Sequence, residues 1–347
     1  MTVNVDSTVT DFGVSSAAYF PDYVTVHPGD TIDFTLQPSG DPHTVTFGSL
    51  VDVGLKKARE GDSGEEPLEL VQIPDLIPAG AFAVSQGTAQ PCFLKTGGPP
   101  RELTAACPQM AQPEFDGSYS VYNSGWLDER SPFSVKFAAS VKPGAYSFFC
   151  ALHRAGMTGV VNVVPAAQRV PSPADVAANG ATKLGGFVDG LRDAYREMQS
   201  LAPARGQAGG YAERVLDASI SEFGPAQAKL KVGQSMTWTF YGSHTISFNV
   251  ARTAPGLREQ SADGAVRVNP KLVDPVRSAG MPRPVPTTAG TTVIDGGSWD
   301  GSGPKSSGLV YSRPPALRAY RLTFTRPGTY SYVCLVHPRM DGRVVVG

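Results

Sequence analysis

Two short stretches of the sequence each place a cysteine, a histidine and a methionine within eight residues. They are "CALHRAGM", with Cys150, His153 and Met157, and "CLVHPRM", with Cys334, His337 and Met340. The chain has 4 Cys, 5 His and 7 Met in all. A repeated cluster of such scarce side chains therefore indicates a site rather than chance.

One further histidine precedes each stretch, His43 in "HTVTF" and His244 in "HTISF". A thiolate, two imidazoles and a thioether form a soft, mixed donor set that suits a copper ion cycling between Cu(I) and Cu(II). The thiolate and imidazoles bind in a plane and the thioether on a long axial bond, so little rearrangement accompanies electron transfer. The spacing predicts two copper centres, although zinc also accepts imidazole and thiolate ligands.

The elements that must position these ligands also occur twice. "DSTVTDFG" (6–13) is echoed by "DASISEFG" (217–224), "DYVTVHPGDTIDFTL" (22–36) by "AKLKVGQSMTWTF" (228–240), and "VKPGAYSFFCALH" (141–153) by "TRPGTYSYVCLVH" (325–337). Apolar and polar residues alternate in the echoes, which are bounded by Gly and Pro turns, as in half-buried strands. We expect an all-β chain of two tandem β-sandwich domains, residues 1–168 and 208–347, joined by a linker over 169–207.

The linker is predicted to contain one amphipathic helix. Ser172 followed by Pro173 is a helix-start signal. Apolar residues then recur at helical spacing: Leu184, Phe187, Val188, Leu191, Tyr195 and Met198. We expect this face to pack on a domain, because acidic residues on the helix disfavour the alternative of binding at a membrane surface.

With these residues in place, both copies resemble the cupredoxins, the blue-copper domains typified by plastocyanin, amicyanin and pseudoazurin. The resemblance implies a Greek-key sandwich and two type 1 copper sites. Their ligands would be His43, Cys150, His153 and Met157 in one and His244, Cys334, His337 and Met340 in the other. It also implies that His153 and His337 lie near the surface, where redox partner proteins would dock. Thr44 and Thr245 stand where such domains commonly have Asn, so the contact towards the cysteine sulfur is expected to differ.

Duplicated domains of this kind also build copper enzymes, which need additional histidines. Trinuclear clusters use His-x-His pairs, which this sequence lacks, and a nitrite-reductase-like site needs three histidines where only His27 remains. We therefore expect a non-enzymatic electron carrier. A copper-handling or storage protein and an interaction module that kept the fold are the alternatives.

The remaining cysteines, Cys92 and Cys107, lie in the first of two Pro- and Gly-rich insertions, over 51–120 and 251–305. A disulfide between them is expected, worth roughly 3 kcal/mol for a ~15-residue loop; a Cu(I) site with Met110 is the minor alternative. A disulfide favours an oxidising, extracytoplasmic location, with a leader removed. Near-neutral charge, 30 Lys+Arg against 31 Asp+Glu, disfavours nucleic-acid binding, and no apolar run is long enough to cross a membrane.

Overall fold

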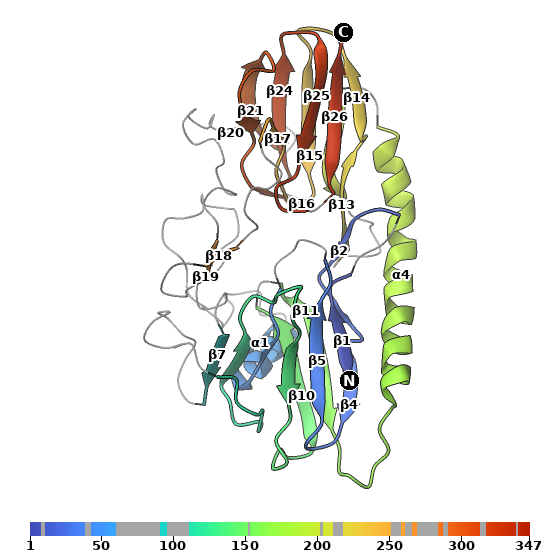
Figure 1. Ribbon diagram of the computed structural model, residues 1–347, viewed down its shortest axis with the longest axis vertical. Helices are drawn as coiled ribbons and strands as arrows, with labels where there is room; N and C mark the ends of the chain where they lie inside the picture. The colour runs from blue at the N-terminus through green and yellow to red at the C-terminus, as the bar shows by residue number, and fades with distance from the viewer. Residues whose placement is uncertain are drawn as a thin grey trace.

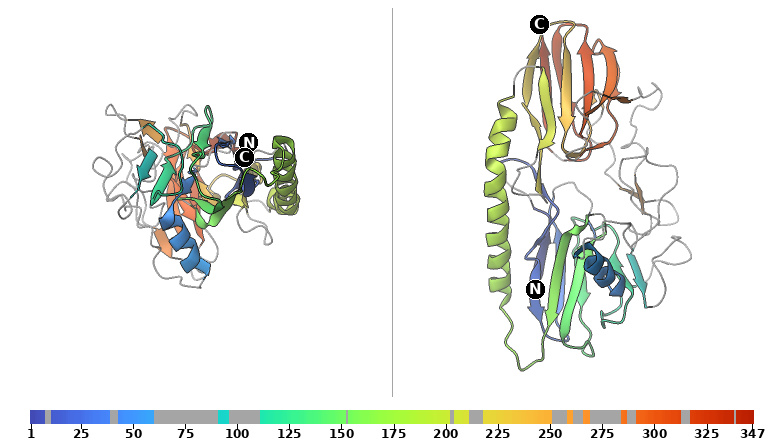
Figure 2. Two further views of the ribbon diagram at one scale, coloured as in Figure 1. Left: turned by 90° about the horizontal axis from the view of Figure 1, so that it is seen from below. Right: turned by 180° about the vertical axis from the view of Figure 1, so that it is seen from behind.

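The computed structural model describes residues 1–7, 11–38, 43–59, 91–95, 111–151, 153–201, 204–210, 218–250, 258–260, 266–268, 284–286, 291–312, 317–337 and 339–347. They form two β-sandwiches stacked end to end, with one long helix running along both (Figures 1 and 2). Each sandwich has its own buried apolar core. The predicted all-β fold of two tandem β-sandwich domains is confirmed.

The first domain consists of two facing sheets and a short helix. One sheet has the order β3 (Tyr19–Phe20), β1 (Thr2–Val5), β5 (Thr31–Leu36) and β9 (Phe133–Lys136). The other has the order β4 (Tyr23–Val26), β11 (Arg154–Val163), β10 (Gly144–Cys150), β6 (Thr46–Phe47), β8 (Val121–Ser124) and β7 (Pro91–Leu94). Helix α1 (Ser49–Arg59) follows β6.

The second domain repeats this plan. Its larger sheet has the order β2 (Val14–Ser16), β13 (Ala218–Gly224), β12 (Arg205–Gly210), β15 (Ser235–Phe240), β24 (Arg318–Phe324), β21 (Thr292–Trp299) and β20 (Pro284–Pro286). The facing sheet has the order β14 (Gln227–Leu230), β26 (Asp341–Val346), β25 (Gly328–Val333), β17 (Ser247–Phe248) and β22 (Lys305–Ser306). Two ribbons pair β16 (Gly242–His244) with β23 (Val310–Ser312) and β18 (Arg258–Gln260) with β19 (Val266–Val268).

Strand pairing gives the residue-by-residue correspondence of the two copies. In the first, β1 runs parallel to β5 with Val5 opposite Leu36; in the second, β12 runs parallel to β15 with Ala208 opposite Phe240. The residue after each strand also matches, because Gln37 N donates to Val5 O and Tyr241 N donates to Ala208 O. β12 is therefore the counterpart of β1. This corrects the alignment expected from "DSTVTDFG" and "DASISEFG", whose similarity does not reflect equivalent positions.

Both cores are built by the alternation seen in the sequence. β5 and β15 each alternate partly buried with buried residues along their whole length. Their buried aromatic residues, Phe34 and Trp238, pack against the aromatic residues of the facing sheet, Phe148 in the first domain and Tyr332 in the second. Such edge-on ring pairs contribute beyond the area that they bury. The two sheets of each domain are thereby held at a fixed spacing above the ligand-bearing loops.

Helix α4 (Pro173–Gln199) lies in the predicted linker and begins with a capping box between Ser172 and Asp175. Its buried face includes Val188, Leu191 and Met198, so the predicted packing of an apolar face is confirmed. Leu191 and Met198 share a cluster with Phe12 and Val14 of the first domain and Ile220 of the second. No helix among the described residues combines the length and the apolarity needed to span a membrane.

The domain junction is also crossed by the chain itself. β2, which comes from the N-terminal 16 residues, pairs with β13 of the second domain, with Val14 opposite Ile220. Beside it, Gly13 N donates to the Glu222 carboxylate at 2.8 Å. The two domains are therefore tied by a shared sheet as well as by α4 (Figure 1).

Among the described residues, the first insertion holds a helix and a strand that the sequence analysis did not predict, α1 and β7. Helix α1 occupies its start, and the buried side chains of Val51 and Phe149 pack together there. Leu50, Val51 and Leu55 have helical spacing. The Pro- and Gly-rich composition of the following residues obscured this short signal.

Candidate metal centres

Two groups of side chains are placed so that each could hold one metal ion. They are His43, Cys150 and His153 in the first domain and His244, Cys334 and His337 in the second. Within each group the candidate ligand atoms all lie within 4.8 Å of one another. The structure thus brings together six of the eight ligands predicted from the sequence. Elsewhere in the described ranges, no third group of three such side chains does so.

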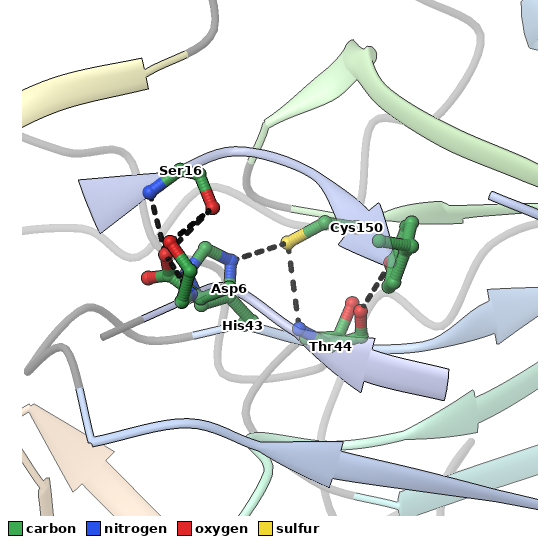
Figure 3. Close-up of polar contacts among 7 residues, drawn as sticks. Asp6, Ser16, His43, Thr44 and Cys150 are labelled. Atoms are coloured by element: carbon green, nitrogen blue, oxygen red, sulfur yellow. Dashed lines mark hydrogen bonds and ion pairs between the residues drawn. The ribbon is translucent and has the colours of Figure 1, made fainter. Parts of the chain in front are cut away.

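The first group is assembled where two neighbouring strands meet. Cys150 is the last residue of β10, and His43 lies just before β6, which pairs with β10. The Cys150 Sγ lies 3.9 Å from His43 Nδ1 and accepts a hydrogen bond from the Thr44 backbone N–H at 3.4 Å (Figure 3). His153 follows in the turn between β10 and β11, with its ring centroid 4.8 Å from that of His43.

The two imidazoles of this group each offer one nitrogen to a shared point. His43 Nε2 is engaged by the Asp6 carboxylate at 2.9 Å, which leaves its Nδ1 facing the sulfur. His153 Nδ1 is buried and makes no standard hydrogen bond to the described residues. A buried nitrogen of this kind is costly unless it has a partner. A thiophilic ion bound between these atoms would supply that partner, so the residues fit a copper ion.

The second group has the same plan. His244 ends β16, and Cys334 follows β25. Cys334 Sγ lies 4.0 Å from His244 Nδ1 and 3.5 Å from His337 Nδ1, and the two Nδ1 atoms are 3.0 Å apart. The Thr245 N–H donates to Cys334 Sγ at 3.4 Å, as Thr44 does in the first domain. The remaining nitrogen, His244 Nε2, contacts the Tyr241 carbonyl oxygen at 2.8 Å.

The predicted axial methionines are both buried close to these groups. Met157 lies in β11 and belongs to the same apolar cluster as Cys150. Met340 belongs to the cluster of Cys334 and closes the ligand loop, because its carbonyl accepts from Cys334 N at 3.0 Å. Each methionine is therefore buried in the apolar cluster that contains the cysteine of its own group.

Burial and neighbouring charges shift the proton equilibria of the metal-free ligands. Burial raises the pKa of the Cys150 thiol, but the neighbouring His153 and His43 outweigh it and hold that pKa well below its usual value. His337 and His244 do the same for the pKa of Cys334. Burial would lower the pKa of His43, yet hydrogen bonds to Asp6 and Cys150 raise it to about 10. Both sulfurs are thus poised as thiolates, the form that binds metal.

The threonines that replace the expected Asn have a structural role of their own. The Thr44 hydroxyl accepts from Ala151 N at 2.8 Å, and the Thr245 hydroxyl accepts from Leu335 N at 2.9 Å. Each bond joins the histidine-bearing strand to the residue after the cysteine. The backbone N–H of the same threonine donates the hydrogen bond to the cysteine sulfur in both domains.

The two C-terminal histidines differ in exposure. His153 is partly exposed, as predicted, whereas His337 is only 3% exposed, so the prediction that it lies near the surface is wrong. Glu222 of β13 lies near His337, and its carboxylate accepts a hydrogen bond from Gly13 N at the domain junction. The second candidate site is therefore more buried at its C-terminal histidine than the first, which the sequence did not show.

The other residues singled out from the sequence lie elsewhere. His27 Nε2 contacts the Gln168 carbonyl oxygen at 2.7 Å, consistent with a turn residue. Cys92 is buried in β7, but Cys107 lies outside the described residues, so their disulfide stays a prediction. Asp6 was missed, because nothing in the sequence relates it to a histidine 37 positions away.

Comparisons with known proteins give no family model and no curated protein that matches the chain. Solved structures do match. Plastocyanin from Dryopteris crassirhizoma is 20% identical, with 47% of this chain and 100% of that chain covered and a TM-score of 0.23. Auracyanin from Roseiflexus castenholzii is 19% identical, covering 47% and 95%, with a TM-score of 0.23. A variant amicyanin is 12% identical, covering 47% and 81%, with a TM-score of 0.23. On its own strand order and its two His/Cys/His groups, the chain resembles the cupredoxins.

Proposed function

We propose that this protein is an electron carrier with two type 1 copper centres, one in each domain. The observation that carries the proposal is the repetition of one ligand arrangement: a cysteine at the end of a strand and two histidines, with ligand atoms within 4.8 Å in both copies. A copper ion bound there would supply a one-electron couple. Met157 and Met340 would be the weak axial ligands.

The way that the chain holds these ligands favours electron transfer over ligand exchange. Cys150, Cys334, His43 and His244 are buried, and the outer nitrogens of both upstream histidines already have protein partners. Ligands fixed before the metal binds keep one geometry in both oxidation states. A copper-handling protein, the second candidate, would need ligands that can open to release the ion.

The histidine count also favours a carrier over an enzyme. Beyond the two ligand sets only His27 remains, and its side chain contacts Gln168 on the first domain. A nitrite-reductase-like site would need three histidines at one place. We therefore assign no catalytic residue.

We further propose that redox partners dock at His153 and that the protein works outside the cytoplasm. His153 is partly exposed, while His337 is buried. The location would suit a disulfide between Cys92 and Cys107. A partner surface at His153 predicts that adding bulk beside it slows reduction by a small redox protein more than it slows reduction by a small chemical reductant.

The test is a titration of the metal-free protein with Cu(II) while the visible spectrum is recorded. An intense blue band that saturates at two coppers per chain is expected, with Cys150→Ser and Cys334→Ser each losing one equivalent. Reversible voltammetry then separates a carrier from a copper-handling protein. Absence of any blue band in the wild-type protein would refute the proposal, and binding without a reversible couple would favour copper handling.

A further inference from the structure

The two candidate centres have matching ligands but differ in the group that contacts the outer nitrogen of the upstream histidine. The outer nitrogen of His43 contacts a carboxylate oxygen of Asp6 at 2.9 Å, whereas the outer nitrogen of His244 contacts the neutral carbonyl oxygen of Tyr241 at 2.8 Å. Asp6 is completely buried. In the first centre a carboxylate therefore lies beside a candidate ligand (Figure 3), whereas the corresponding described contact in the second centre is to a neutral carbonyl oxygen.

The position of Asp6 has an exact structural counterpart in the second domain. Val5 is equivalent to Ala208 by strand register, so Asp6 is equivalent to Gly209. Both residues have a positive φ, 62° and 77°. A Cβ on Gly209 would lie 2.4 Å from His244 Nε2 and 2.1 Å from the Tyr241 oxygen, too close for any side chain. The second domain thus has no room for a side chain at the position where the first domain places the Asp6 carboxylate.

The loop before each upstream histidine explains how both arrangements fit. Six positions separate Gln37 from His43, but three separate the equivalent Tyr241 from His244. The shorter connection brings the Tyr241 carbonyl to its own histidine and closes the space at Gly209. In the first domain that space is filled by the Asp6 side chain.

Asp6 is itself held by several donors. Its Oδ1 accepts from Ser7 N at 2.7 Å, from Ser16 N at 2.5 Å and from the Ser16 hydroxyl at 3.0 Å. These bonds leave Oδ2 for His43. A buried carboxylate is costly unless its oxygens are satisfied, and here both are. The carboxylate is therefore held in one orientation, with Oδ2 towards His43.

We infer that Asp6 is a positioning residue that orients His43 and makes the two metal centres unequal. A carboxylate on the far nitrogen of a metal-bound histidine fixes the ring tautomer and raises the basicity of the ligand. Added negative charge favours the more highly charged oxidation state of a bound metal. The first centre should therefore have the lower midpoint potential. This expectation rests on the proposed copper function, whereas the orientation of His43 by Asp6 does not depend on it.

The first test needs no metal and no variant. In the metal-free, ¹⁵N-labelled full chain, NMR should show His43 protonated at Nε2, with that proton further downfield than the Nε2 proton of His244. The carboxylate is the stronger acceptor, which accounts for the difference. A His43 ring protonated only at Nδ1, or proton shifts in the reverse order, would overturn the inference.

The second test uses Asp6→Asn, which removes the charge and keeps the size of the side chain. Asn tolerates positive φ, so the backbone is not strained. Cys334→Ser isolates the first centre for voltammetry and Cys150→Ser isolates the second. Asp6→Asn should raise the potential of the first centre, with at least a tenfold loss in the ratio of Cu(II) to Cu(I) affinity, about 59 mV for one electron. The second centre should be unchanged.

The matched control is Asp193→Asn, which removes one charge from an exposed position of α4. An equal shift in this control, or no shift in Asp6→Asn, would refute the tuning role. If the protein binds no copper at all, the proposed function fails, but the His43 proton shifts still decide whether Asp6 positions the ring.

Discussion

The Thr44 hydroxyl provides the sharpest test of how the ligand loops are held. It accepts a hydrogen bond from Ala151 N at 2.8 Å and so connects the strand of His43 to the residue after Cys150. Valine has the same shape as threonine but no acceptor. Thr44→Val therefore leaves the Ala151 N–H without its partner and also removes the contact between the Thr44 and Thr46 hydroxyl oxygens at 3.1 Å.

The expected cost comes mainly from the unpaired Ala151 N–H, because the Thr46 hydroxyl keeps its hydrogen bond to Asn123. A buried donor left without a partner costs about 1–3 kcal/mol. Ala151 is only partly buried, so water can recover some of the loss, and we expect the free energy of unfolding to fall by about 1–2 kcal/mol. In a domain of this size the melting temperature should then fall by roughly 2–8 °C.

The assay is urea unfolding of the metal-free protein, followed by near-ultraviolet circular dichroism. The control is Thr35→Val on β5, because the Thr35 hydroxyl makes no hydrogen bond to the described part of the chain and its side chain is partly buried. The midpoint of Thr44→Val should fall with an unchanged m-value, while Thr35→Val stays within about 0.5 kcal/mol of the parent. Equal stability of the two variants would refute the proposed role of the hydroxyl.

Three further outcomes are expected. A Cβ on Gly180 would lie 2.8 Å from the Phe20 carbonyl, so Gly180→Ala should lower the free energy of unfolding in urea by about 1–3 kcal/mol. Gly185 has nothing within 4 Å of such a Cβ, so Gly185→Ala should raise the free energy of unfolding by roughly 0.5–1 kcal/mol. The reverse order would show that α4 is not packed as described. The pKa of His43 is raised from 6.5 to about 10, so in the metal-free protein its contribution to stability is complete below pH 6.5 and is lost as the pH rises through 10. The melting temperature should therefore fall less steeply with pH in Asp6→Asn than in the parent. The same dependence of melting temperature on pH in both proteins would contradict the role given to Asp6 in raising this pKa. Peptide mapping without reductant should recover Cys92 linked to Cys107, and recovery of both as free thiols would exclude the disulfide.

The sequence alone was sufficient for the fold class and for the six ligands that the structure brings together. Apolar residues that alternate with polar ones between turns indicate the short, half-buried strands of a β-sandwich. Cys150-x2-His153 is a local pattern, because both residues lie in one loop. Because the chain is duplicated, the strand pattern and the ligand pattern each occur twice in the sequence. The helix of α4 was equally readable, because its cap and its apolar face both lie within one short segment.

Tertiary structure decided what depends on residues distant in sequence. His337 is buried, which no local pattern indicates, and the contact of Asp6 with His43 joins residues 37 positions apart. The similarity of "DSTVTDFG" to "DASISEFG" even suggested the wrong counterpart for Asp6, which register identifies as Gly209. Local patterns carry periodicity and spacing, but which side chain reaches a ligand across two strands is fixed only by how those strands pair.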